Sequence, residues 1–152
     1  MTDPIGAETT RLLALFEATG ARRIEADILQ PAEALLDLYG EDIRGRAYVT
    51  HDALRGEQML RPDFTVPVVQ MHMAGDATPA RYTYAGPVFR RQDIDATRPS
   101  EYPQVGYEVF GEVTLAEEEE AVLFALFHRA LDGVSCRAVM GDMGILRAAV
   151  AA

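Results

Sequence analysis

Lysine is absent from the 152-residue sequence, and all 14 basic side chains other than histidine are arginines. This absence excludes enzymes that form a Schiff base through a lysine amine, and it excludes the lysine of Walker-type phosphate sites. Cysteine is limited to Cys136. One cysteine excludes an intrachain disulfide and favours a reducing compartment, for which we expect the cytoplasm. Cys136 itself is expected to be a small buried hydrophobic residue.

Negative charge dominates, since 24 acidic residues give a formal net charge of −10. A nucleic-acid-binding surface normally needs clustered positive charge, so nucleic acid is not an expected partner. Arg90, Arg91 and Arg98 nevertheless form one local basic group. The sequence has no apolar run that would span a membrane, and its polar, acidic first residues do not resemble a signal peptide. Hydrophobic residues make up 49%, which suits one domain over residues 1–152.

The most informative stretch is a predicted β-hairpin formed by residues 81–91 and 102–113. Both runs are rich in tyrosine, valine and phenylalanine, and the polar segment QDIDATRPSE between them is typical of a turn. Because side chains alternate along a strand, Gln104, Gly106 and Glu108 share one face. Glycine leaves space where a side chain would stand, so we expect a concave polar patch there.

A hollow that binds a small zwitterion is one interpretation of this patch. If the two strands pair with these faces together, Arg90, Gln104 and Glu108 point into the same space. The carboxylate would accept an ammonium group, and the arginine would bind an anion. The alternative is an ordinary hairpin whose polar face is only solvated, and the pattern alone favours that alternative.

The remaining pattern predicts an α+β fold, in which an antiparallel sheet is flanked by helices. Helices are expected at 9–19, 32–39, after LRPDFT, from Thr114 and after Gly141. Strands are expected at 23–29, 47–50, 57–60 and 135–140, and residues 40–46 are expected to form a loop. The helix that starts at Thr114 is expected to bury Val122, Leu123, Leu126, Phe127 and Leu131.

Two local motifs indicate how helices begin. Thr114 and Glu117 have the spacing of a capping box. Asp63 or Thr65 can cap the helix that follows LRPDFT, and Pro67 suits its first turn. Capping alone would explain the presence of Asp63 and Thr65. The three histidines lack neighbouring ligands at metal-binding spacing, so no metal site is expected.

Two segments resemble a known family. FRRQ, the loop after it and RPSEYPQVGYEVFG are similar to motif 2 of the class II aminoacyl-tRNA synthetases, and most similar to the histidyl branch. LRPDFT, at residues 60–65, resembles the segment that precedes motif 2 in that branch. Histidyl-tRNA synthetases usually have glutamate where this chain has Asp63. The form L-R-x-D-x-T is typical of a paralogue, the regulatory subunit of ATP phosphoribosyltransferase, which takes part in the first step of histidine biosynthesis.

The resemblance implies a binding site for free histidine and, beside it, a remnant of a phosphate site. The residues that match the histidine site are Asp63, Thr65, Gln104 and Glu108. Those that match the synthetase arginines for the α-phosphate and the terminal phosphates of ATP are Arg90 and Arg98. Gln92 replaces the glutamate of the family's F-R-x-E, and the lost charge is expected to weaken any metal or adenine-side contact.

Nearly the whole chain takes part in the resemblance, but it corresponds to roughly the first half of the family's catalytic-type domain. Motif 3, the histidine-specific loop and the anticodon-binding domain have no counterpart in the sequence. Residues 9–29 match motif 1, a dimer-interface element, although Asp27 stands where a proline is usual. We therefore expect either a fragment or a truncated member of the family, and a homodimer.

The function implied by the resemblance is that of a non-catalytic regulatory subunit of a glycosyltransferase, ATP phosphoribosyltransferase. Its expected partners are the short-form catalytic subunit and free histidine, which would act in feedback inhibition, and no cofactor is expected. One alternative is a fragment of a histidyl-tRNA synthetase catalytic domain, which would need motif 3 and a basic face for tRNA. Another is a small amino-acid-binding domain that keeps the pocket without the partner.

Overall fold

The computed structural model describes residues 3–75, 78–92, 95, 97–111, 116–137 and 139. The helices in this part of the chain are α1 (Pro4–Glu17), α2 (Ala32–Tyr39), α3 (Ile43–Arg46), α4 (Thr65–Ala74) and α5 (Ala116–Ala130). The strands are β1 (Arg22–Arg23), β2 (Leu29–Pro31), β3 (Val49–Asp52), β4 (Gly56–Leu60), β5 (Ala80–Phe89) and β6 (Glu101–Phe110). None of these helices is long and apolar enough to cross a membrane.

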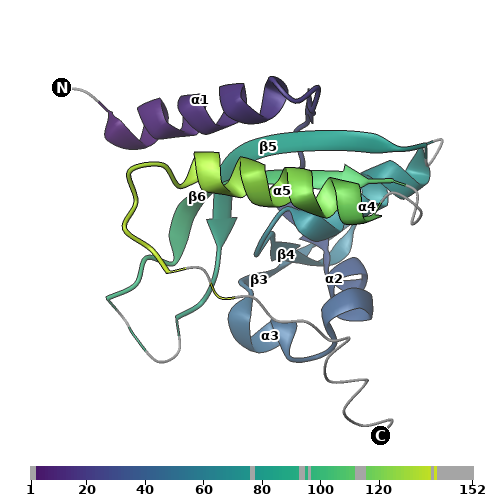
Figure 1. The fold of residues 1–152 in the computed structure, drawn as a ribbon. Helices are drawn as coiled ribbons and strands as arrows, with labels where there is room; N and C mark the ends of the chain where they lie inside the picture. Colours follow the sequence, from purple (N-terminus) through teal and green to yellow (C-terminus); the bar gives the residue numbers. More distant parts are fainter. Residues whose placement is uncertain are drawn as a thin grey trace, which may run out of the picture.

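The strands form two three-stranded sheets, ordered β1-β5-β6 and β2-β4-β3. β1 runs parallel to β5, whereas the other strand pairs are antiparallel. β5 and β6 pair along their full lengths, with Tyr84 opposite Gly106 and Gly86 opposite Gln104. The predicted hairpin and the predicted α+β class are therefore confirmed, and the short parallel strand β1 is an addition to the antiparallel sheet (Figure 1).

Aromatic side chains cover one face of the β5–β6 hairpin. Phe64 stacks on Tyr84 with ring centroids 4.4 Å apart, and His72 of α4 stacks on Phe110 at 3.9 Å. Tyr82 and Tyr84 are buried beneath them. This face carries the residues of the predicted polar patch, so the alternative of a merely solvated face is wrong. The tyrosines on β5 supply apolar area that α4 and the preceding loop bury.

Helix α1 packs against the opposite face of the hairpin. The rings of Phe16 and Tyr107 have centroids 5.4 Å apart, and the Thr19 hydroxyl lies 3.0 Å from the Tyr107 hydroxyl. Arg11 of α1 donates to the carbonyl of Ala130 at 2.7 Å, which ties α1 to the end of α5. Figure 1 shows α1 along one side of β5, with α2 and α3 on the opposite side of that strand.

A second core joins α2 and α3 to the β2-β4-β3 sheet. Its buried members are Ala32, Leu35, Ile43, Ala47, Met59 and Val66. The segment 40–46 was predicted to be a loop, but it contains α3. Ile43 and Ala47 are 4% and 1% exposed, so this short helix is anchored at both ends by apolar contacts. Charged residues flank Ile43 and Ala47 in the sequence, so their apolar spacing was not recognised as a helix.

Three other expectations need correction. The strand predicted at 23–29 is split, because residues 22–23 pair with β5 and residues 29–31 pair with β4 of the other sheet. Helix α1 begins at Pro4 and not near Thr9, since the carboxylate of Asp3 accepts the N–H of Ile5 at 3.1 Å and caps the helix. Cys136, expected to be buried, is exposed.

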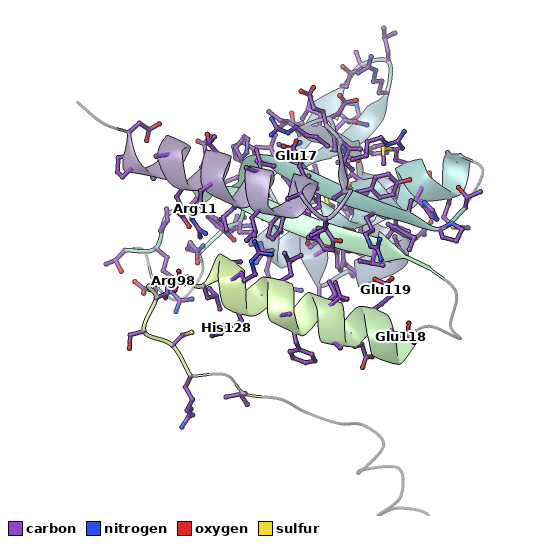
Figure 2. All side chains as sticks on the ribbon, turned by 45° about the horizontal axis from the view of Figure 1, so that its top comes forward. Arg11, Glu17, Arg98, Glu118, Glu119 and His128 are labelled. Atoms are coloured by element: carbon purple, nitrogen blue, oxygen red, sulfur yellow. The ribbon has the colours of Figure 1, made fainter. Side chains whose placement is uncertain are left out.

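The predicted buried stripe of α5 is also largely wrong. Leu126 is 5% exposed, but Val122, Leu123 and Phe127 are 46%, 36% and 67% exposed. An ion pair between Glu119 and Arg81 helps to hold the helix against the hairpin, and Figure 2 shows Glu119 on the sheet side of α5. The capping residue Thr114 and the predicted last helix lie outside the described residues. Of the strand predicted at 135–140, the described residues 135–137 and 139 are not in a strand.

Candidate functional site

The LRPDFT loop is fixed by Arg61, whose side chain is buried. Its Nε donates to the carbonyl of Pro87 at 2.9 Å, and its Nη1 donates to the carbonyl of Ala26. The guanidinium lies 3.9 Å from the ring centroid of Phe64, and burial lowers the pKa of Arg61. A Cβ at Gly86 would come within 2.6 Å of the Arg61 Nη2, so glycine permits this close approach. The loop therefore enters α4 along a fixed path.

The Asp63 carboxylate accepts hydrogen bonds from two elements. The hydroxyl of Tyr39, at the end of α2, lies 3.0 and 2.9 Å from its two oxygens. The N–H of Thr65 donates to Oδ1 at 3.1 Å, which satisfies a free amide in the first turn of α4, although the N-cap residue itself is Phe64. Arg90 Nη2 lies 3.9 Å from Oδ2. Burial and the bond to Asp63 raise the pKa of Tyr39, which therefore remains a hydrogen-bond donor at neutral pH.

Glu108 accepts two hydroxyl groups on the covered face of β6. The hydroxyls of Thr65 and Tyr84 lie 3.2 and 3.1 Å from the same oxygen, Oε1. Burial and the charge of Glu108 raise the pKa of Tyr84. Glu108 also contributes to the raised pKa of Tyr39, so its charge acts on the neighbouring hydrogen-bonded pair of Tyr39 and Asp63. Thr65 donates its N–H to Asp63 and its hydroxyl to Glu108, and thus links the two carboxylates.

The space above Gly106 is occupied, so the predicted hollow with Gly106 as its floor is wrong. A Cβ at this position would lie only 2.1 Å from Cζ of Tyr84. Tyr84 stands opposite Gly106 in the hairpin, and its ring crosses the glycine so that its hydroxyl reaches Glu108. Glycine at 106 therefore makes room for a tyrosine of the protein and not directly for a ligand.

Gln104 keeps one acceptor unused. Its Oε1 is buried and, within the described part of the chain, has no hydrogen-bond partner. A buried acceptor without a donor is unfavourable, so this oxygen marks a place where a ligand or water donor is needed. Gln104 and Glu108 are four residues apart on one strand face, which separates their Cα atoms by about 13 Å. A ligand that contacts both needs polar groups at both of its ends.

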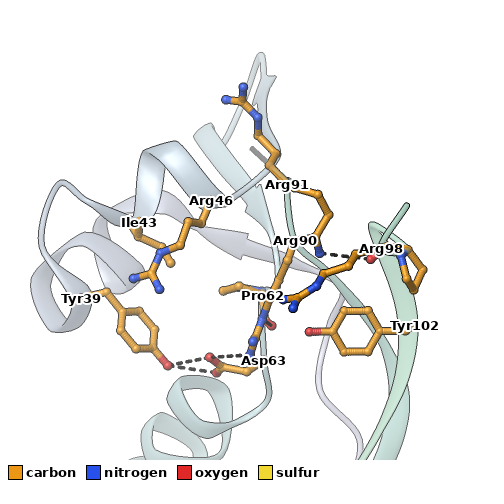
Figure 3. Close-up of a pocket in the computed structure, with 11 residues that line it drawn as sticks. Tyr39, Ile43, Arg46, Pro62, Asp63, Arg90, Arg91, Arg98 and Tyr102 are labelled. Atoms are coloured by element: carbon orange, nitrogen blue, oxygen red, sulfur yellow. Dashed lines mark hydrogen bonds and ion pairs between the residues drawn. The ribbon is translucent and has the colours of Figure 1, made fainter. Parts of the chain in front are cut away.

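A cavity of about 500 Å³ opens beside Asp63 and Arg90. Its lining residues are Tyr39, Ile43, Arg46, Pro62, Asp63, Arg90, Arg91, Gln92, Arg98, Pro99 and Tyr102. Figure 3 shows the guanidinium groups of Arg46, Arg90 and Arg98 around this space, whereas the group of Arg91 is directed away from Asp63. Arg90 is held there by a 2.8 Å bond from its Nε to the carbonyl of Pro62.

The structure divides the predicted site into two neighbouring parts. Arg90 and Arg98 line the cavity with Asp63, as the predicted anion site requires. Gln104 and Glu108 are not among the residues that line it, and the predicted single hollow of Arg90, Gln104 and Glu108 stays a prediction. The two parts meet at Asp63, whose carboxylate faces the cavity and also accepts the N–H of Thr65.

Sequence reasoning missed Tyr39 and Arg46. Tyr39 lies 24 residues before its partner Asp63, and its position at the end of a short helix gave no sign of this contact. Arg46 lies in the segment that was predicted to be a loop. The described residues contain no group of three histidine, cysteine, aspartate or glutamate side chains that could hold a metal ion.

Comparison with known proteins places this site in a family. Residues 5–152 match the family model for histidyl-tRNA synthetase. Proteins named ATP phosphoribosyltransferase regulatory subunit from Agrobacterium fabrum and Mesorhizobium japonicum are 37% and 36% identical to this chain, over 93% and 100% of it. The chain spans 38% and 41% of the lengths of these relatives.

A solved structure of a related protein has a similar fold. The crystal structure of a histidine–tRNA ligase subunit from Alicyclobacillus acidocaldarius is 26% identical, with a TM-score of 0.70. The similarity covers 90% of this chain and 41% of that one. Both the hairpin with its motif 2 residues and the LRPDFT loop lie within the matched range. The fold is thus that of the class II synthetase-related proteins, and the chain belongs to the histidyl-tRNA synthetase family.

Proposed function

We propose that this chain is the histidine-sensing part of an ATP phosphoribosyltransferase regulatory subunit and performs no chemistry of its own. The observation that carries the proposal is the similarity, along nearly the whole chain, to two proteins with that name. Asp63 supports it, because L-R-x-D-x-T resembles the regulatory branch. The proposed partner is the short-form catalytic subunit in the cytoplasm, and the proposed assembly includes a second copy of this chain and no nucleic acid.

Free histidine is the proposed ligand of the polar strand face. The residues that would bind it are Asp63, Thr65, Gln104 and Glu108. Glu108 would accept an N–H of the ligand at one end, in addition to the hydroxyls of Thr65 and Tyr84. At the other end, Gln104 would gain a donor for its buried oxygen, which has none among the described residues. A charged hydrogen bond contributes about 1.5–3 kcal/mol, so each of these contacts would change affinity by about tenfold or more.

Arg90 and Arg98 would act as an anion site beside the histidine. Arg90 lies 3.9 Å from Asp63, and Arg98 lies 3.6 Å from Asp95. The Arg90 and Arg98 side chains are 44% and 73% exposed, so both ion pairs are weak and an anionic ligand can replace them. No lysine is present that would substitute for these arginines.

The test measures the activity of a short-form catalytic subunit alone, with this chain, and with this chain plus histidine. The proposal expects the chain to bind the catalytic subunit and raise its activity, and expects histidine to lower that activity. Glu108→Gln should weaken histidine binding by about tenfold in a calorimetric titration. Glu101→Gln is the matched control, because Glu101 is exposed at the other end of β6. Equal histidine affinity in both variants would contradict the assignment of Glu108.

A catalytic fragment of a histidyl-tRNA synthetase is the second candidate. The family model and the similarity to the Alicyclobacillus acidocaldarius ligase subunit favour it. Histidine-dependent exchange between ATP and pyrophosphate distinguishes the two functions. Exchange above background would establish amino-acid activation and overturn the non-catalytic proposal, whereas background exchange together with histidine binding would support it.

A further inference from the structure

Arg46 presents to the cavity a guanidinium group that no described residue of the chain partners. The side chain is exposed, and within the described part of the chain it has no hydrogen bond or ion pair. Its backbone is nevertheless fixed, because the N–H of Arg91 donates to the Arg46 carbonyl at 2.8 Å. Ile43 and Ala47, on either side of it, are buried in the second core. Arg46 is therefore a positive group on a rigid support.

Arg44, on the same short helix, differs from Arg46 because its guanidinium group is paired with carboxylates. Its Nε lies 2.8 Å from Glu41, and its Nη1 also bonds Glu57. Arg44 does not line the cavity that contains Arg46. The two arginines thus carry the same charge two residues apart, but one is neutralised by carboxylates and the other faces the cavity. A protein of net charge −10 has many carboxylates available, yet none of the described ones pairs with Arg46.

The charge of the cavity wall is strongly positive. Arg46, Arg90, Arg91 and Arg98 line it, and Asp63 is the acidic residue among the lining residues. Arg46 comes from α3, Arg90 follows β5, and Arg98 lies in the hairpin loop, so the groups approach from three directions (Figure 3). A single phosphate is small compared with a cavity of about 500 Å³, whereas a chain of phosphates extends between separated guanidinium groups.

We propose that Arg46 is a ligand-binding residue that selects compounds with two or more adjacent phosphate groups over monophosphates. This inference rests on the proposed function, in which Arg90 and Arg98 form an anion site. Arg46 extends that site to α3 and belongs to neither of the sequence motifs that marked it. One phosphate group would lie between Arg90 and Arg98, and the next would reach Arg46.

The test titrates the full chain with pyrophosphate, tripolyphosphate and orthophosphate by calorimetry at low ionic strength. We expect both condensed phosphates to bind more tightly than orthophosphate. Arg46→Gln should weaken pyrophosphate binding by about tenfold, the loss of one charged contact. It should leave orthophosphate binding nearly unchanged. Arg44→Gln removes the same charge from the same helix and should change pyrophosphate affinity by less than about twofold.

Three results would overturn the assignment of Arg46. These are equal pyrophosphate affinity in Arg46→Gln and the unchanged protein, equal loss in Arg44→Gln and Arg46→Gln, and no preference for pyrophosphate over orthophosphate. Far-ultraviolet circular dichroism of both variants is the check that they are folded. Histidine titration of Arg46→Gln separates this inference from the proposed function. If Arg46→Gln loses phosphate selectivity but still binds histidine, the effect of the substitution is confined to the cavity. If the chain selects condensed phosphates but does not bind histidine, only the regulatory proposal fails.

Discussion

The hydroxyl of Tyr39 lies 3.0 and 2.9 Å from the two oxygens of Asp63, and this contact joins α2 to the LRPDFT loop. It engages a carboxylate that the resemblance assigns to the histidine site. A ligand amine at Asp63 must therefore share the carboxylate with Tyr39 or displace it. The same carboxylate lies near Arg90, so Tyr39 influences both the anion cavity and the polar strand face.

Replacing Tyr39 with phenylalanine should destabilise the protein. The variant removes a hydrogen bond to a charged group, which is worth about 1.5–3 kcal/mol in the free energy of unfolding. Asp63 keeps the Thr65 N–H, so α4 should still begin at the same residue. Urea unfolding followed by circular dichroism measures the loss. Tyr48→Phe serves as a control at a tyrosine on the surface, and an equal effect in both variants would show that the Asp63 contact is not stabilising.

The pairing of the two hairpin strands could be predicted because local signals determine it. β-rich runs around a polar turn indicate the hairpin and alternation indicates which side chains share a face, whereas the register that sets Tyr84 opposite Gly106 was not predicted. What covers this face could not be predicted, because Phe64 and His72 come from a different segment of the chain. Arg46 and Tyr39 were missed for the same reason, since their contacts with the site are tertiary. The α5 stripe was wrong because an apolar pattern shows which residues can be buried, not whether a partner element is present.

Alkaline pH should destabilise the fold through Tyr39 and Tyr84. Burial and neighbouring carboxylates raise the pKa of both groups in the folded protein, whereas an unfolded tyrosine has a pKa of about 10. Their contribution to stability is therefore complete below pH of about 10 and decreases as the pH rises further, because the unfolded chain loses these protons first. Unfolding free energies measured between neutral pH and pH of about 11 should show this decrease. The double variant Tyr39→Phe, Tyr84→Phe should show a smaller pH dependence, and an equal one would contradict the mechanism.

Gly106→Ala should disrupt the polar strand face. The added Cβ would lie 2.1 Å from Cζ of Tyr84, so the ring must move away and its hydroxyl leaves Glu108. Forcing a methyl group into such a contact costs about 1–3 kcal/mol. Histidine affinity should fall as well if Glu108 is the ligand acceptor. Gly111→Ala is the control, since nothing lies within 4 Å of its Cβ position. Urea unfolding and histidine calorimetry of both variants check the prediction, and equal stability of the two would contradict it.

The attachment of α5 should depend on Leu126 and not on the phenylalanine beside it. Leu126 is 5% exposed and Phe127 is 67% exposed, so truncation removes buried area only at Leu126. Leu126→Ala should lower the free energy of unfolding by about 2 kcal/mol, the lower end for a buried leucine because few other side chains of α5 are buried. Phe127→Ala should change it by less than about 0.5 kcal/mol. Urea unfolding of both variants at two protein concentrations measures these values. A loss at Phe127 that grows with protein concentration would contradict the prediction and place an interface between chains on this face of α5.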